Sequence, residues 1–151
     1  MELKFRLLKA EEIECRIAAI KQDGIVLLLY KDARVDQNML DEAVGCMDWQ
    51  RSHSRNNANC TVSIWDKEKQ QWIGKEDTGK ESTTEREKGL ASDSFKRACF
   101  NWGIGRELYS APTIWISNKQ CEIKNVKGKL ICNDKFSVEK IAYDESRNII
   151  G

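Results

Sequence analysis

A glycine-containing stretch between residues 74 and 80 has the spacing of a phosphate-binding loop. Gly74, Gly79 and Lys80 fit the pattern G-x-x-x-x-G-K, in which backbone N–H groups and a lysine surround nucleotide phosphates. That pattern continues with Ser or Thr, whose hydroxyl binds Mg²⁺, but here the next residue is Glu81, whose carboxylate repels phosphate. We therefore expect a turn that ends a strand and leads into a helix, rather than a nucleoside triphosphatase.

Acidic residues and one histidine are the other groups that could support catalysis. Glu76, Asp77 and Glu81 could bind a divalent cation, as in a metal-dependent nuclease. Lysines are interspersed among them, however, which favours ordinary surface ion pairs. His53 is the only histidine, which argues against His-rich metal sites and His-dependent hydrolases, and we expect it to be a surface strand residue. The sequence predicts neither an enzyme nor a cofactor, and a nuclease is the weakest alternative.

Basic residues recur in a segment with helical periodicity after residue 84. Lys88 and Lys96 lie about 80° apart on a helix that advances 100° per residue, and Arg97 follows directly. Cations on the open side of a helix that packs on a sheet can line a groove for a polynucleotide, whose phosphates release counterions on binding. The simpler interpretation is a solvated face with an i,i+4 pair between Asp93 and Arg97.

Tryptophans in the preceding strands could add base stacking to such a groove. Trp49, Trp65 and Trp72 are interleaved with cations, and aromatic side chains stack on unpaired bases. Tryptophans are more often part of a core, which is the alternative interpretation for these three.

The elements that would position these residues begin with a hairpin and a short helix. Residues 12–20 alternate loosely, Asp23 and Gly24 form a hairpin turn signal, and residues 25–30 form an apolar strand. The segment EEIECRIAAI could also be a helix. Asp36 is a suitable N-cap for a helix over residues 36–44, which Gly45 would end.

Three strands are predicted to follow as an antiparallel meander. They cover residues 47–54, with Met47, Trp49, Arg51 and His53 on one face, then 60–66 and 71–78. In the second strand Cys60, Val62 and Ile64 alternate with polar or aromatic residues, which indicates one buried face.

The longest helix is predicted after the meander. Thr84 and Glu87 match a capping box, and Gly103 and Gly105 would end the helix. The core-facing stripe repeats at spacings of three and four and comprises Leu90, Ala91, Ser94, Phe95, Ala98 and Trp102.

Shorter strands complete the chain. Residues 113–117 predict a strand, residues 121–132 a hairpin around Lys127-Gly128-Lys129, and residues 136–144 another strand. Residues 148–151 resemble a strand that is cut short, which suggests that the native chain continues. The fold class is therefore α+β: an antiparallel sheet, made of a three-stranded meander plus an N-terminal hairpin, packed by a long helix in a β-β-β-α core.

Length and composition are consistent with one folded domain over residues 1–151, with its core at 30–117 and C-terminal strands at 118–151. Of the 151 residues, 40% are hydrophobic and 32% are charged, with 25 Lys and Arg against 24 Asp and Glu. A net charge of +1 excludes a histone-like protein but not a basic groove. No secretory signal or membrane-length apolar run is present. We expect a cytoplasmic protein whose six cysteines, without a CxxC pair, are reduced and mostly buried.

Three stretches resemble a known family. They are KDARVDQNMLDEAVGCMDWQRSHS, CTVSIWDKEKQQWIGKEDTGKES and TEREKGLASDSFKRACFNWGIGRELYSAPTIWI, between Tyr30 and Ile116. Together they resemble a phage-encoded single-strand annealing protein of the Rad fifty-two superfamily. The stretch EKGLASDSFKRACFNWGIGRELY is the most specific, and the order strand, strand, strand, helix is that family's core.

The resemblance implies that protomers assemble into rings or filaments and hold single-stranded DNA in a basic groove between sheet and helix. Lys96 and Arg97 match the family's Lys-Arg pair, Lys88 matches another DNA-contacting lysine, and Arg34 matches a DNA-contacting arginine before the first helix. The implied function is ATP-independent annealing of complementary strands in recombination and repair, inside a bacterial host. Phe100 stands where some relatives are basic, and no second, outer DNA site is apparent.

A different class of function stays open on the sequence alone. The chain could be an oligomeric adaptor that recruits a phage exonuclease or a single-strand-binding protein, without annealing DNA itself. Absent or salt-insensitive DNA binding with retained oligomers would favour the adaptor.

Overall fold

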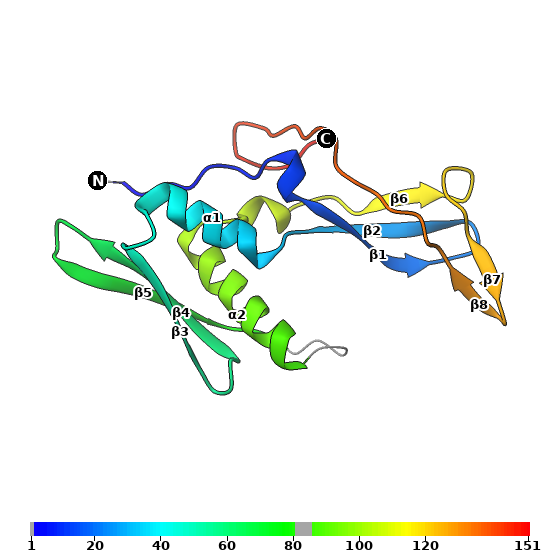
Figure 1. Ribbon diagram of the computed structural model, residues 1–151. Helices are drawn as coiled ribbons and strands as arrows, with labels where there is room; N and C mark the ends of the chain where they lie inside the picture. The colour runs from blue at the N-terminus through cyan, green and yellow to red at the C-terminus, as the bar shows by residue number, and fades with distance from the viewer. Residues whose placement is uncertain (1, 81–85) are drawn as a thin grey trace. The chain divides into compact units, whose positions relative to one another are not determined.

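The computed structural model describes residues 2–80 and 86–151. In the helix that begins at residue 86, side chains are described from Gly89 onward. The elements of the chain are η1 (Ala10–Glu12), β1 (Glu14–Ile20), β2 (Gly24–Tyr30), α1 (Ala33–Val44), β3 (Trp49–Ser54), β4 (Asn59–Asp66), β5 (Gln71–Thr78), α2 (Arg86–Trp102), η2 (Arg106–Leu108), β6 (Ile114–Ser117), β7 (Lys124–Val126) and β8 (Lys129–Ile131) (Figure 1). The α+β class with antiparallel sheets, predicted from the sequence, is confirmed.

The chain divides into two compact units. Unit 1 comprises residues 1–7 and 33–106, and unit 2 comprises residues 8–32 and 107–151. The predicted core, residues 30–117, therefore contains parts of both units. Each unit is described separately below.

Unit 1 is built on the predicted meander. Strands pair in the order β3-β4-β5, all antiparallel, and helix α2 packs on β4 and β5. Alternation along β4 places Cys60, Val62 and Ile64 in the core, as predicted, because successive side chains of a strand point to opposite faces. Helix α2 contributes a buried stripe to the same core, which includes Leu90, Ser94, Phe95, Ala98 and Cys99. Figure 1 shows α2 lying across this sheet.

Two boundaries in unit 1 differ from the prediction by two residues or more. Helix α1 begins at Ala33, so Asp36 lies within the first turn, fully buried, instead of capping the helix. Arg34 is consequently inside α1 rather than before it. Strand β3 begins at Trp49, and Met47 is 83% exposed because residues 45–48 form a turn. Gly45 ends α1 as predicted, with the positive φ of 84° that favours glycine.

The C-terminal end of α2 is as predicted. Gly103 has a φ of 106°, and the Ile104 N–H donates to the carbonyl of Cys99, which satisfies a helix-end carbonyl. The predicted capping box rests on Thr84 and Glu87, which lie outside the described residues and side chains.

Unit 2 contains a second three-stranded sheet with the order β1-β2-β6. The predicted hairpin is confirmed, and EEIECRIAAI contains a strand rather than a helix. Ile25 and Leu27 of β2 form the core of this unit with Cys132. The β7–β8 hairpin is also confirmed, with Lys127 and Gly128 at its turn.

The predicted strands over residues 136–144 and 148–151 are wrong. Only two isolated bridges form, between Glu14 and Ser137 and between Tyr143 and Ile149. The apolar residues Phe136, Val138 and Ile141 do not keep a strict period of two, so the segment cannot present one continuous face to a neighbouring strand.

The cysteines occupy three kinds of environment. Cys60, Cys99 and Cys132 are buried, Cys15 and Cys121 are half-buried, and Cys46 is exposed. Burial raises the pKa of the Cys60 thiol to about 11, which makes it unreactive near neutral pH.

Within the described residues, no helix is both long and apolar enough to span a membrane.

Candidate nucleic-acid interface

Helix α2 is fixed to the meander along its C-terminal half by polar contacts as well as by its core stripe. The indole Nε1–H of Trp102 donates to the backbone carbonyl of Val62 at 2.8 Å. The Lys75 ammonium lies 4.7 Å from the centre of the Trp102 ring, and Asn101 donates to the backbone carbonyl of Glu76. These contacts hold the backbone of α2 against the sheet and so fix the points from which its basic side chains extend.

Lys96 and Arg97 are consecutive residues near the middle of α2, so their side chains leave the helix about 100° apart. Both side chains are half-buried, and neither belongs to the apolar stripe formed by Phe95 and Ala98. The Nε–H of Arg97 donates to Asp93 Oδ2 at 2.9 Å, so the i,i+4 pair anticipated from the sequence is present. With side chains 41% and 33% exposed, this pair contributes only about 0.3–0.5 kcal/mol. Arg97 can therefore exchange Asp93 for an anionic ligand at little cost.

Asp93 has a second role that the sequence did not indicate. Its Oδ2 also accepts a hydrogen bond from the backbone N–H of Lys80 at 2.7 Å, which ties the end of β5 to α2. A Cβ at Gly79 would lie 2.7 Å from the backbone nitrogen of Ser94, so only glycine fits at this crossing. The second glycine of the apparent phosphate loop is thus explained by packing.

The remaining part of that loop motif is a strand. Gly74 lies inside β5, where a Cβ would come within 2.9 Å of the side chains of Ser63 and Thr61. An extended strand does not converge its backbone N–H groups on a phosphate, and residues 71–78 form the strand that the meander predicted. No group of three or more His, Cys, Asp or Glu side chains in the described ranges is arranged to hold a metal ion.

The other two predicted contact residues lie on different helices. Arg34 is exposed in the first turn of α1, which packs on α2 in unit 1. Lys88 is in the first turn of α2, and its side chain falls outside the described part.

The inner face of β3 carries a polar network that the sequence did not predict. Trp49, Arg51 and His53 share a half-buried face, as their alternation indicated, but this face meets α2 rather than solvent. The guanidinium of Arg51 lies 4.1 Å from the centre of the Phe95 ring and donates to His53 Nε2 from Nε at 3.0 Å. His53 Nδ1 is 3.4 Å from the hydroxyl of Ser94. The prediction of a surface histidine is therefore wrong: His53 is half-buried and links β3 to α2 through its contact with Ser94.

This position sets the protonation state of His53. Burial lowers its pKa below 6.5, and the adjacent Arg51 guanidinium lowers it further. Nε2 accepts from Arg51 only when it carries no proton, so the folded state favours the neutral ring.

We therefore expect unit 1 to lose stability as the pH falls through the window below 6.5. The unfolded chain binds a proton near pH 6.5 whereas the folded chain does not, so the stabilisation is complete above that pH and decreases below it. Urea unfolding at about pH 7.5 and about pH 5.5 measures this, since no carboxylate of ordinary pKa titrates there. His53→Gln should flatten the dependence. An equally steep dependence in the variant would contradict the role of His53.

The three tryptophans considered for base stacking separate onto two faces. Trp49 stacks on Phe95 with ring centres 6.1 Å apart, so it belongs to the core. Trp65 and Trp72 pair directly across β4 and β5 on the opposite face of the sheet, with an edge-to-face geometry and 5.5 Å between centres. Trp72 is 41% exposed. Stacking on unpaired bases is thus geometrically open only to the Trp65–Trp72 pair.

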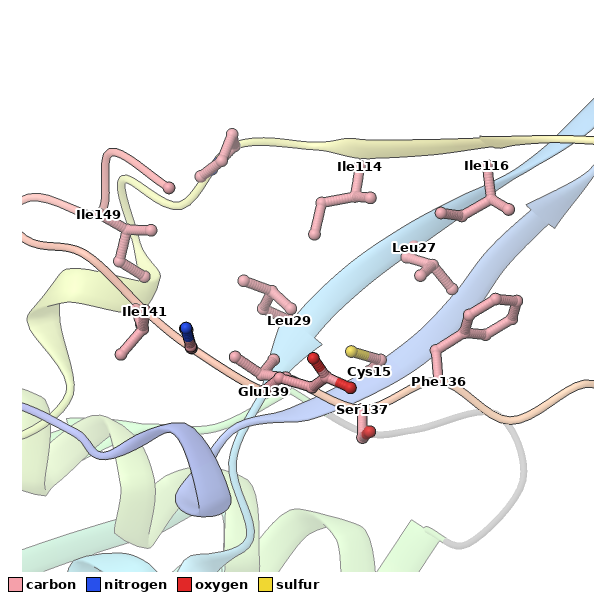
Figure 2. Close-up of a pocket in the computed structure, with 14 residues that line it drawn as sticks. Cys15, Leu27, Leu29, Ile114, Ile116, Phe136, Ser137, Glu139, Ile141 and Ile149 are labelled. Atoms are coloured by element: carbon pink, nitrogen blue, oxygen red, sulfur yellow. The ribbon is translucent and has the colours of Figure 1, made fainter. Parts of the chain in front are cut away.

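Unit 2 has a cleft of about 580 Å³ between its sheet and the C-terminal segment. One wall comprises Leu27, Leu29, Ile114 and Ile116, and the other includes Phe136 and Ile141. Figure 2 shows these apolar side chains on both sides of the space. This mostly apolar lining, which also includes Glu139 and Lys140, offers few groups that could contact a phosphate backbone.

Comparisons with models of protein families, with curated proteins and with solved structures find no match to this chain.

Proposed function

We propose that this chain binds single-stranded DNA through unit 1 and anneals complementary strands without ATP in recombination, as a homo-oligomer. The observation that carries the proposal is the pair of consecutive cations, Lys96 and Arg97, on a helix anchored to an antiparallel meander. Exposed Arg34 on the adjoining helix α1 adds a third cation to the same unit. The resemblance of residues 30–116 to single-strand annealing proteins of the Rad fifty-two superfamily supports the annealing role.

The proposed mechanism needs no bond-making chemistry. Cations contact the phosphates, and counterion release supplies sequence-independent affinity. Bases that point away from the protein remain readable, and correct pairing is downhill by about 1.4 kcal/mol per base-pair step. Several protomers along one strand increase the avidity without any additional contact within a protomer. The protein would act in a bacterial host, encoded by a phage or prophage.

The direct test is an annealing assay with two labelled complementary oligonucleotides and no nucleotide cofactor. We expect the protein to bind each strand and to accelerate their pairing, and light scattering to show an oligomer. The logarithm of the binding constant should fall with the logarithm of salt concentration by about 0.7 for each phosphate contacted. Oligomers that bind no DNA, or bind it independently of salt, would overturn the proposal and favour an adaptor that recruits an exonuclease or a single-strand-binding protein.

A further inference from the structure

The β7–β8 hairpin of unit 2 presents lysines from a short, regular scaffold. Val126 pairs with Lys129 and Lys124 pairs with Ile131 in an antiparallel register, so these four side chains share one face. Lys127 occupies the turn itself. The two strands form a separate two-stranded sheet, drawn in orange in Figure 1.

The tip of the hairpin is a tight turn closed by a side-chain hydrogen bond. Lys127 and Gly128 both have positive φ, 53° and 82°, as in the tight turns that match the twist of a hairpin. The Asn125 Oδ1 accepts a hydrogen bond from the Gly128 N–H at 3.0 Å, which fixes the turn. A fixed turn lowers the entropy that the lysine backbone loses on binding a ligand.

The base of the hairpin is anchored while its tip is exposed. Cys132 is buried with Ile25 and Leu27, and Cys121 and Ile123 pack against that cluster. Residues 124–129, in contrast, are all exposed, so the tip makes no core of its own. The three lysines at the tip are therefore not explained by packing.

The hairpin segment has an excess of positive charge. Residues 124–131 contain three lysines and no carboxylate, in a chain whose net charge is +1. Lys124 forms an ion pair with Glu122 at 3.8 Å, and both side chains are more than half exposed, so the pair contributes little. The Asp134 carboxylate lies outside residues 124–131 and accepts a hydrogen bond from the backbone N–H of Glu122 at 2.7 Å.

We infer that the β7–β8 hairpin is a second phosphate-contact site for single-stranded polynucleotide, separate from helix α2. Lys124, Lys127 and Lys129 contact backbone phosphates, and Val126, which is 46% exposed, gives an apolar surface to a sugar or base. The positive charge beside the exposed apolar side chain of Val126 favours a polynucleotide, which carries both phosphates and apolar base surfaces, and the inference rests on the proposed function. An acidic peptide or an anionic membrane surface is the competing class of occupant.

The test is a triple substitution of Lys124, Lys127 and Lys129 by glutamine in the full chain. Titrations use a thymidine oligonucleotide of about 30 nucleotides, longer than a single-strand site. We expect at least tenfold weaker binding at moderate salt, and a log–log salt slope that is smaller by about 2 because each lost phosphate contact removes about 0.7. In the wild-type protein, oligonucleotide should protect these lysines from acetylation, as mass spectrometry would show.

The control variant replaces three exposed lysines elsewhere, Lys67, Lys69 and Lys140, by glutamine and should keep the wild-type slope. Unchanged affinity and slope in the hairpin variant, with unprotected lysines, would overturn the inference. Wild-type binding to phosphatidylserine vesicles that the hairpin variant alone loses, with normal oligonucleotide binding, would overturn it too.

The same measurements separate the two sites. If the α2 variant loses binding and the hairpin variant keeps it, only the hairpin site is refuted. If the hairpin variant loses binding and the α2 variant keeps it, the α2 site is refuted and the hairpin site is supported.

Discussion

Replacing Lys96 and Arg97 together by alanine should weaken single-stranded DNA binding at least tenfold while the fold is retained. The two side chains are half-buried and lie outside the buried stripe of α2, so their truncation leaves that stripe intact. A charge-assisted hydrogen bond contributes about 1.5–3 kcal/mol, and 1.4 kcal/mol is tenfold in affinity. Fluorescence anisotropy over a range of salt concentrations should also give a log–log slope smaller by about 1.4 for two phosphates.

The matched control is Lys67→Ala with Lys69→Ala, which removes the same charge from the exposed β4–β5 turn of unit 1. This control should bind as the wild type does. Equal losses in both double variants would mean that only net charge matters, and the α2 interface would then be wrong. Circular dichroism of both variants should match the wild type.

Asp93 provides the opposite test of the same interface. Its carboxylate neutralises part of the Arg97 charge through their 2.9 Å pair. Asp93→Asn removes the negative charge but keeps a side-chain oxygen that can accept from the Lys80 N–H. If Arg97 contacts phosphate, this variant should bind DNA more tightly than the wild type. Weaker binding with an intact fold would exclude Arg97 as a contact.

Local patterns in the sequence were sufficient for most elements of unit 1. Strict alternation in residues 60–66 identified the buried face of β4, and spacings of three and four identified the buried face of α2. Lys96 and Arg97 could be placed beside that stripe for the same reason. What alternation could not show was which element covers each face, so Arg51 and His53 were not recognised as the network beneath Phe95.

Contacts between residues distant in sequence were beyond the reach of pattern reasoning. Strand β6 pairs with β2, about 90 residues earlier, and the local pattern of residues 113–117 does not indicate which strand it pairs with. Gly79 matched a phosphate-loop pattern, but the close approach of Ser94 accounts for it. Helix α1 begins three residues before its apparent cap, and Asp36 is buried within the first turn, so local capping preference did not decide this boundary.

Phe95→Ala should produce the largest loss of stability, about 3–5 kcal/mol, because it removes a fully buried aromatic ring. Trp49 stacks on this ring and the Arg51 guanidinium lies over it. Truncation therefore leaves a cavity and also removes the contacts that Trp49 and Arg51 make with the ring. Domains are stable by about 5–15 kcal/mol, so the variant should be close to unfolding at growth temperature.

Urea unfolding followed by tryptophan fluorescence measures this effect, because Trp49 reports directly on the Phe95 contact. Phe100→Ala is the matched control on the same helix. Its ring is half-buried beside Arg106, with 5.6 Å between guanidinium and ring centre, so its removal should cost about 1 kcal/mol, within the range of a partly exposed contact. Equal losses for the two variants would contradict the packing of α2 on the meander. That packing is what gives Lys96 and Arg97 fixed positions, so a Phe95→Ala protein that stays folded should still bind DNA less tightly.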